Sequence, residues 1–255
     1  MSASIAIPTQ DILIAFMMLC RTSGIFILTP PFSDSNIKPI IKMVFAISVC
    51  MMMYGQLAET IRPALSIEPV FLLIMIFIEL FVGIALGSII KVIVVSTQVA
   101  GLTIASQIGL SSASMFDPSQ QNQNSTFGLL LIMLTTIGIL EANLHIEIIS
   151  GFFDSYKKIP IGSFLNDYNN FISIFISSIS KMWSVGLQMS MPFILINIAV
   201  MISAGILSKL MPQLQIFFVL LPIQILIGII LFAITLSGIL LWFIEFFSNE
   251  MNLIF

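Results

Sequence analysis

The feature that most constrains this chain is the length of its apolar runs. From Val70 to Ile108 the sequence is almost continuously apolar, over nearly twice the roughly 20 residues that a helix needs to cross a bilayer. Such a run either bends into two segments or projects beyond the membrane. No stretch sustains the alternation of apolar and polar residues that marks a half-buried strand. Further apolar runs cover residues 12–29, 40–58, 127–149, 171–207 and 216–247. Together the runs predict an all-α protein with about five to seven helical segments.

The scarcity of charged residues places these helices in a membrane. Charged residues make up 8% of the 255 residues and hydrophobic residues 58%, whereas a soluble domain carries roughly 25% charged residues. So few charges cannot cover a water-facing surface, so we expect a multi-pass membrane protein or a subunit buried in a larger assembly. The net charge of −3 comes with no clustered basic face, so nucleic acid is not an expected partner.

Prolines and glycines indicate how the helices bend and pack. Pro192 and Pro222 lie inside the last two apolar runs, and a proline within a helix removes a backbone donor and usually causes a kink. With the turn at SKLMPQLQ, residues 208–215, these runs predict a long, kinked helical hairpin. Gly83 and Gly87 form a small-xxx-small pair that permits close contact between helices.

A polar but almost uncharged segment, QIGLSSASMFDPSQQNQNST, separates two apolar runs at residues 107–126. Asp117 is the single charged residue between positions 92 and 140. Glycine and serine residues favour mobility, amides bind neither sign of charge strongly, and an Asp-Pro step fixes a local turn. From the residues alone, two interpretations stay open: an outside loop, or a segment that lines or closes a passage.

Five of the charged residues that interrupt the apolar runs are candidates for a structural or functional role. A charge within a membrane-spanning helix costs roughly 2.5–3.5 kcal/mol on insertion scales, so it is usually paired or functional. One interpretation is pairing between helices or placement near the end of a run. The other is a small-solute secondary transporter in which glutamates couple ions to transport. The five residues are Arg21, Glu79, Glu141, Glu147 and Lys181.

The sequence offers no basis for an enzyme. It contains no nucleophile-elbow, zinc-protease or phosphate-loop motif. His145 is the single histidine and lacks the second nitrogen or thiolate ligand that a metal site needs. Cys20 and Cys50 lie in apolar runs without metal-binding spacing, so we interpret them as buried small residues. We therefore expect no catalytic residue, no metal site and no cofactor.

Three stretches, in matching order and spacing, resemble the flagellar biosynthetic protein FliR family of the bacterial flagellar export gate. RTSGIFILTPPFSDSNIKPIIKMVFAIS, residues 21–48, is similar to the family's arginine-led first helix and proline-bounded link. QIGLSSASMFDP, residues 107–118, is similar to its Gly-Leu-Ser-x-Ala segment followed by Asp-Pro. LSKLMPQLQIFFVLLPIQILIG, residues 207–228, resembles its basic-x-x-Pro-Gln-x-Asn-x-Phe run. The resemblance extends from about residue 12 to residue 245.

The resemblance implies a subunit that joins FliP and FliQ in a helical assembly through which unfolded flagellar proteins pass, with FlhB around it and FlhA beneath. It implies one FliR-type domain over residues 1–255, with FliP-like hairpins over 1–170 and a FliQ-like C-terminal hairpin over 171–255. It implies that residues 107–123 plug the channel. The plug residues would be Gly109, Leu110, Ser111, Met115, Phe116, Asp117 and Pro118, and the turn and subunit-contact residues Arg21, Lys209, Pro212, Gln213 and Phe217.

The chain departs from the family pattern at three positions. Gln215 stands where the family often has asparagine, Leu220 where glycine is frequent, and Ser112 where an aromatic residue is common. The last departure leaves Met115 or Phe116 to fill the channel centre. Two related interpretations also stay open: a virulence-type secretion homologue, and a scaffold in which the 107–126 segment is dispensable.

Overall fold

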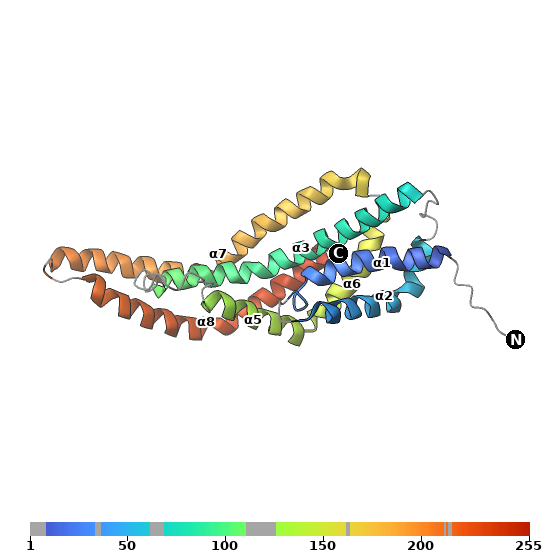
Figure 1. The fold of residues 1–255 in the computed structure, drawn as a ribbon. Coiled ribbons are helices and arrows are strands. Elements are labelled where there is room, and N and C mark those ends of the chain that lie inside the picture. The colour runs from blue at the N-terminus through green and yellow to red at the C-terminus, as the bar shows by residue number, and fades with distance from the viewer. Residues whose placement is uncertain are drawn as a thin grey trace. The chain divides into compact units, whose positions relative to one another are not determined.

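The computed structural model describes residues 9–33, 37–61, 69–110, 126–161, 164–211, 213 and 216–255. Over these ranges the chain is helical and contains no strand, so the predicted all-α fold is confirmed (Figure 1). The helices are α1 (Thr9–Leu28), α2 (Pro39–Ile61), α3 (Pro69–Gln107), α5 (Thr126–Glu141), α6 (Leu144–Lys158), α7 (Phe164–Leu210) and α8 (Ile216–Ile254).

Five of these helices, α1, α2, α3, α7 and α8, are long and apolar enough to cross a membrane. The run from Val70 to Ile108 forms one unbroken helix, α3, of 39 residues. Pro192 and Pro222 lie inside α7 and α8, as predicted. Proline also opens α2 and α3, where its fixed φ and missing N–H suit the first helical position. The expectation of a multi-pass membrane protein is confirmed.

The prediction of a single helical run over residues 127–149 is wrong. Helix α5 ends at Glu141 and α6 begins at Leu144, because Asn143 adopts a left-handed conformation with φ 59°. Asparagine tolerates this conformation better than most residues do. Helix α6 then continues to Lys158, nine residues beyond the end of that run. Its apolar residues recur at helical spacing rather than in a run, and they form its buried face: Leu144, Ile148, Phe152 and Tyr156.

The chain forms two compact units that do not follow chain order. Unit 1 comprises residues 1–92, 140–179 and 247–255, and unit 2 comprises residues 93–139 and 180–246. Helices α3, α7 and α8 each contribute a segment to both units. The assignment of one FliR-type domain, with a division near residue 170, stays a prediction.

Unit 1 has an apolar core between α1, α2, α6 and the first part of α3. Helices α1 and α2 run side by side (Figure 1). The ring of Phe26 meets those of Phe32 and Phe45 edge-on at 5.5 Å and 5.1 Å between centroids, an arrangement that aromatic pairs favour. Met17, Met53 and other adaptable side chains fill the spaces between the helices.

Unit 2 contains the C-terminal part of α7 and most of α8, which pair as the predicted hairpin. Phe193 of α7 contacts Phe232 of α8, with ring centroids 6.3 Å apart, and Asn197, further along α7, contacts Gln224, earlier in α8. The two helices therefore pair antiparallel (Figure 1).

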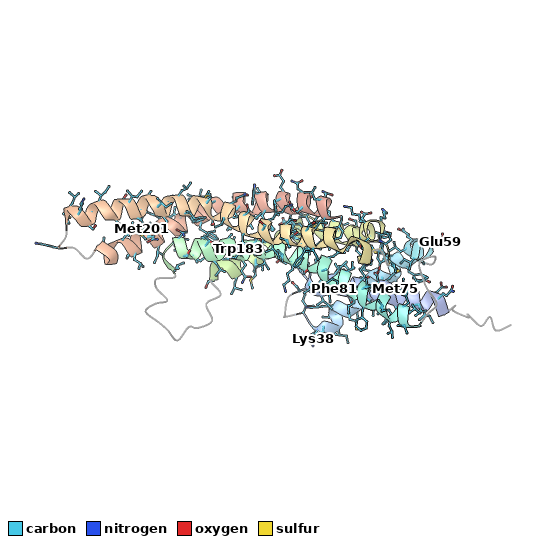
Figure 2. All side chains as sticks on the ribbon, turned by 90° about the horizontal axis from the view of Figure 1, so that it is seen from above. Lys38, Glu59, Met75, Phe81, Trp183 and Met201 are labelled. Atoms are coloured by element: carbon cyan, nitrogen blue, oxygen red, sulfur yellow. The ribbon has the colours of Figure 1, made fainter. Side chains whose placement is uncertain are left out.

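Large parts of α7 and α8 are not covered by this chain. Within each of their candidate spans only 11% of the apolar window is buried, against 44% for α1. Trp183 and Met201 on α7 are 57% and 53% exposed, and Phe81 on α3 is 55% exposed (Figure 2). These side chains are available to lipid or to neighbouring subunits.

Candidate functional site

Three amide side chains meet in unit 2 where α3 ends. The Nε2 of Gln224 on α8 donates to the backbone oxygen of Gln107 at 2.6 Å and to Oδ1 of Asn197 on α7 at 2.8 Å. The Nδ2 of Asn197 donates to Oε1 of Gln107 at 2.6 Å. These three residues, which we call the amide cluster, thus form a closed set of hydrogen bonds that joins α3, α7 and α8.

The amide cluster caps the C-terminus of α3. The last carbonyl groups of a helix have no partner within it, and Gln107 is the last residue of α3. Its carbonyl oxygen instead accepts from Gln224, which is 9% exposed. A side chain of α8 therefore satisfies a backbone group at the point where the 107–126 segment begins.

Gly109 ends this helix and allows Gln224 to approach. Its φ is +86°, in the left-handed region that glycine enters without a steric penalty. Its N–H donates to the carbonyl oxygen of Ser106 at 3.2 Å. A Cβ atom at this position would lie 3.3 Å from Cδ of Gln224, so a larger residue would be strained and crowded against the amide cluster.

An apolar layer lies beside the amide cluster. Ile108 is 2% exposed and contacts α8 at Gly228, where an added Cβ would come within 2.5 Å of the Ile108 side chain. Phe193 of α7, also 2% exposed, is one turn from Asn197. Together these residues line a small pocket with the amide cluster. The hydrogen bonds are therefore formed in apolar surroundings, where an unsatisfied amide would be costly.

The far end of the segment is also held in unit 2. An added Cβ on Gly101 of α3 would lie 2.5 Å from Cα of Gly128 in α5, so the two backbones nearly touch. The ring of Phe127 meets that of Phe232 on α8 edge-on, 4.9 Å between centroids. Both the departure and the return of the 107–126 segment are thus fixed to the same helices.

Of the predicted plug residues, Gly109 and Leu110 lie within the described part of the chain. Gly109 is buried beside Gln224, and Leu110 is partly buried. The other predicted plug residues lie outside the described residues: Ser111, Met115, Phe116, Asp117 and Pro118. The plug assignment stays a prediction.

Unit 1 contains a buried ion pair. Arg21 on α1 donates from Nε and NH2 to the two carboxylate oxygens of Glu79 on α3, at 2.6 Å and 2.9 Å. The two side chains are 0% and 1% exposed. This two-point geometry matches the planar guanidinium to the carboxylate and gives the stronger kind of ion pair.

The other N–H groups of Arg21 donate hydrogen bonds to α6 and to Ile159, the residue that follows this helix. Its NH1 donates to Oγ of Ser155 at 3.4 Å, and both NH1 and NH2 donate to the carbonyl oxygen of Ile159 at 3.2 Å. The guanidinium carbon lies 3.9 Å from the ring centroid of Tyr156, within cation–π range. One arginine on α1 therefore joins α3 and α6, which explains how this chain buries a charge in an apolar core.

The other carboxylates proposed for a transporter have different surroundings. Glu141 is exposed at the end of α5. Glu147 on α6 accepts a hydrogen bond from Ser248 of α8 at 3.2 Å. Glu79 is fully engaged by Arg21. The structure brings Glu79 together with a cation rather than with another carboxylate.

The two glycines that were predicted to permit close helix packing, Gly83 and Gly87, lie against α1. An added Cβ at Gly83 would collide with the carbonyl oxygen of Arg21, and one at Gly87 would lie 2.8 Å from the carbonyl oxygen of Ile25. Lys209 and Gln213 are exposed. Pro212 and the side chain of Phe217 lie outside the described residues. The subunit-contact role of Arg21, Lys209, Pro212, Gln213 and Phe217 stays a prediction.

Asn197 and Gln224 were not predicted from the sequence. Each is an isolated amide within a long apolar run, and such amides in membrane helices usually hydrogen-bond across to another helix. That signal predicts a partner but does not identify it, because the spacing along the chain does not indicate that α3 ends between α7 and α8.

Comparisons with known proteins agree with the resemblance seen in the sequence. Residues 12–250 match the family model described as bacterial export proteins, family 1. The chain is 26% identical over 232 residues to the flagellar biosynthetic protein FliR of Bacillus subtilis, covering 90% of this chain and 88% of that protein. It is 25% identical to the FliR protein of Caulobacter vibrioides over 90% of both chains. It is 29% identical to that of Buchnera aphidicola subsp. Schizaphis graminum over 85% of this chain and 82% of the relative.

A match over this length cannot arise from one shared segment, since it includes most of α1, the Arg21–Glu79 pair, the amide cluster and most of α8. The family predicted from the sequence is confirmed: the chain belongs to the bacterial export proteins, family 1.

Proposed function

We propose that this protein is the FliR-type subunit of a bacterial flagellar type III export gate in the inner membrane. It forms, with FliP and FliQ, the channel through which unfolded flagellar proteins leave the cell, and it catalyses no bond chemistry. Residues 107–123 plug this channel at rest. The C-terminal hairpin, residues 171–255, packs like a FliQ subunit, and residues 1–170 like FliP.

The observation that carries the proposal is that both ends of the 107–126 segment are anchored to the same helices. The chain that holds this segment is similar to FliR proteins over most of their length. The segment leaves α3 at the amide cluster and returns at α5 beside Gly101 and Phe232. A segment with one acidic residue and many amides presents little charge to a passing polypeptide. Fixed ends with a weakly charged middle suit a closure that must exclude ions at rest and give way to an unfolded chain.

The uncovered helices support an assembly with neighbours. Only 11% of the apolar windows of α7 and α8 is buried within this chain. FliP-like and FliQ-like subunits would cover this surface, with FlhB around the assembly and FlhA beneath it. The FliR proteins described above and that of Escherichia coli, which is 26% identical to this chain, favour the flagellar branch over a virulence-type homologue.

The transporter alternative receives no support from the geometry. Glu79 is held by two hydrogen bonds from Arg21, and releasing it as a proton carrier would leave a buried cation without its partner.

Deletion of residues 110–123 tests the plug. We expect the assembled gate to conduct ions at rest, measured as leak current or as dye release from vesicles that contain the purified complex. The control is a gate with the intact chain, and co-purification of FliP and FliQ verifies assembly of both. An assembled deletion variant with an unchanged leak would refute the plug role.

A further inference from the structure

The amide cluster combines two properties that a purely structural contact would not need together. It lies partly buried in apolar surroundings, with Gln224 9% exposed, and two of its three hydrogen bonds end on Gln107, the last residue of α3. Gln107 contributes both its backbone oxygen and its side-chain Oε1. The cluster therefore fixes the direction in which the chain leaves α3.

We propose that Gln107, Asn197 and Gln224 form the positioning site of the export gate: they hold the end of α3 to the α7–α8 hairpin, so that the residues after Leu110 leave from a fixed point. The consequence for ion leakage rests on the proposed function, because it requires that the following residues close the channel. The positioning itself is measured at Leu110 and does not require that the channel be closed by this segment.

Glycine residues on both sides make this contact possible. Gly109 takes a φ of +86° and leaves room for the Gln224 side chain. Gly228, one turn beyond Gln224 on α8, admits Ile108. The close approach of α3 and α8 at this point places the amide nitrogen of Gln224 within reach of the Gln107 carbonyl.

The choice of amides has a consequence for function. Amide side chains do not ionise, so the hydrogen bonds of the cluster do not depend on the protonation state of its side chains. A single charged side chain at the same place would add a fixed charge in apolar surroundings. The site therefore holds the α3 terminus by directional hydrogen bonds without presenting charge.

Isosteric variants separate the hydrogen bonds from packing. Gln224→Glu retains the shape of the side chain but removes the donor of both hydrogen bonds. Asn197→Asp removes the donor to Gln107 in the same way. Gln188→Glu is the matched control, because Gln188 on α7 is exposed and its Nε2 donates to Oγ of Ser184 in its own helix at 3.3 Å.

The experiment places a nitroxide label on Leu110→Cys, in a chain with Cys20→Ala and Cys50→Ala, within the assembled gate. We expect Gln224→Glu and Asn197→Asp to increase label mobility and to raise the ion leak roughly tenfold, since each variant loses partly buried hydrogen bonds. The Gln188→Glu control should match the parent in both measurements. Co-purification of FliP and FliQ checks assembly, and if one variant fails to assemble the other decides the result.

The two proposals fail in different ways. If deletion of residues 110–123 raises the leak but neither amide variant changes label mobility, the positioning site is overturned and the plug stands. If the amide variants raise mobility but the deletion leaves the leak unchanged, the positioning site stands and the plug is refuted.

Discussion

Removing one partner of the Arg21–Glu79 pair leaves the other charge buried without neutralisation. Both side chains are essentially inaccessible, and the loss of one member of a buried pair costs roughly 3–5 kcal/mol. We expect Glu79→Gln to lower the thermal midpoint of the detergent-solubilised protein markedly. Arg21→Met combined with Glu79→Leu should recover most of the loss, because it removes both charges.

The exposed pair of Lys157 and Asp154 is the matched control. Its atoms approach to 2.6 Å, but its side chains are 74% and 41% exposed. Exposed pairs contribute about 0–1 kcal/mol, so Lys157→Met should leave the thermal midpoint nearly unchanged. Equal losses from Glu79→Gln and Lys157→Met would contradict a special role for the buried pair.

The sequence indicated which residues need partners but not which partners they have. Arg21 and Glu79 were predicted to be paired or functional because a lone charge in an apolar run is costly. Their separation along the chain gave no indication that they meet. Asn197 and Gln224 carried the same kind of signal in weaker form. Tertiary contacts of this kind depend on how the helices are placed, which local pattern does not determine.

At the scale of helices, the contact between α1 and α3 depends on glycine. An added Cβ at Gly83 would collide with the carbonyl oxygen of Arg21. Because this oxygen belongs to the backbone of α1, the collision can be relieved only by moving a helix. We therefore expect Gly83→Ala to lower the thermal midpoint, although alanine is the better helix former.

Gly55 in α2 provides the opposite case. An added Cβ there has no atom within 4 Å, so Gly55→Ala should raise stability by up to about 1 kcal/mol through helix propensity alone. If both variants shifted the midpoint in the same direction, close packing of α1 on α3 would not explain Gly83.

The helices that consist of continuous apolar runs could be predicted from the sequence, both that they form and that they are α-helices. Helices α1, α2, α3, α7 and α8 all lie where the runs indicated. Helix α6 was missed because its apolar residues are spaced for one buried face, with charged residues between them. The break at Asn143 was missed because neither proline nor glycine marks it.

At the scale of the whole molecule, the exposed apolar faces predict that neighbours cover α7. Trp183 is 57% exposed, and Trp242→Phe leaves it as the single tryptophan of the chain. We expect brominated lipids to quench its fluorescence strongly when the protein is reconstituted alone and weakly when FliP and FliQ are present. Equal quenching in both preparations would mean that α7 faces lipid in the gate.

The central claim, that the 107–123 segment lies in the secretion path, is tested most directly by crosslinking. A photoreactive maleimide is attached to Phe116→Cys in the chain without Cys20 and Cys50, and export is stalled with a substrate fused to a folded domain. Met52→Cys, on a residue that is 83% exposed on α2, is the control. We predict a substrate crosslink at position 116 and none at position 52. An assembled, stalled gate with no crosslink at position 116 would contradict the claim.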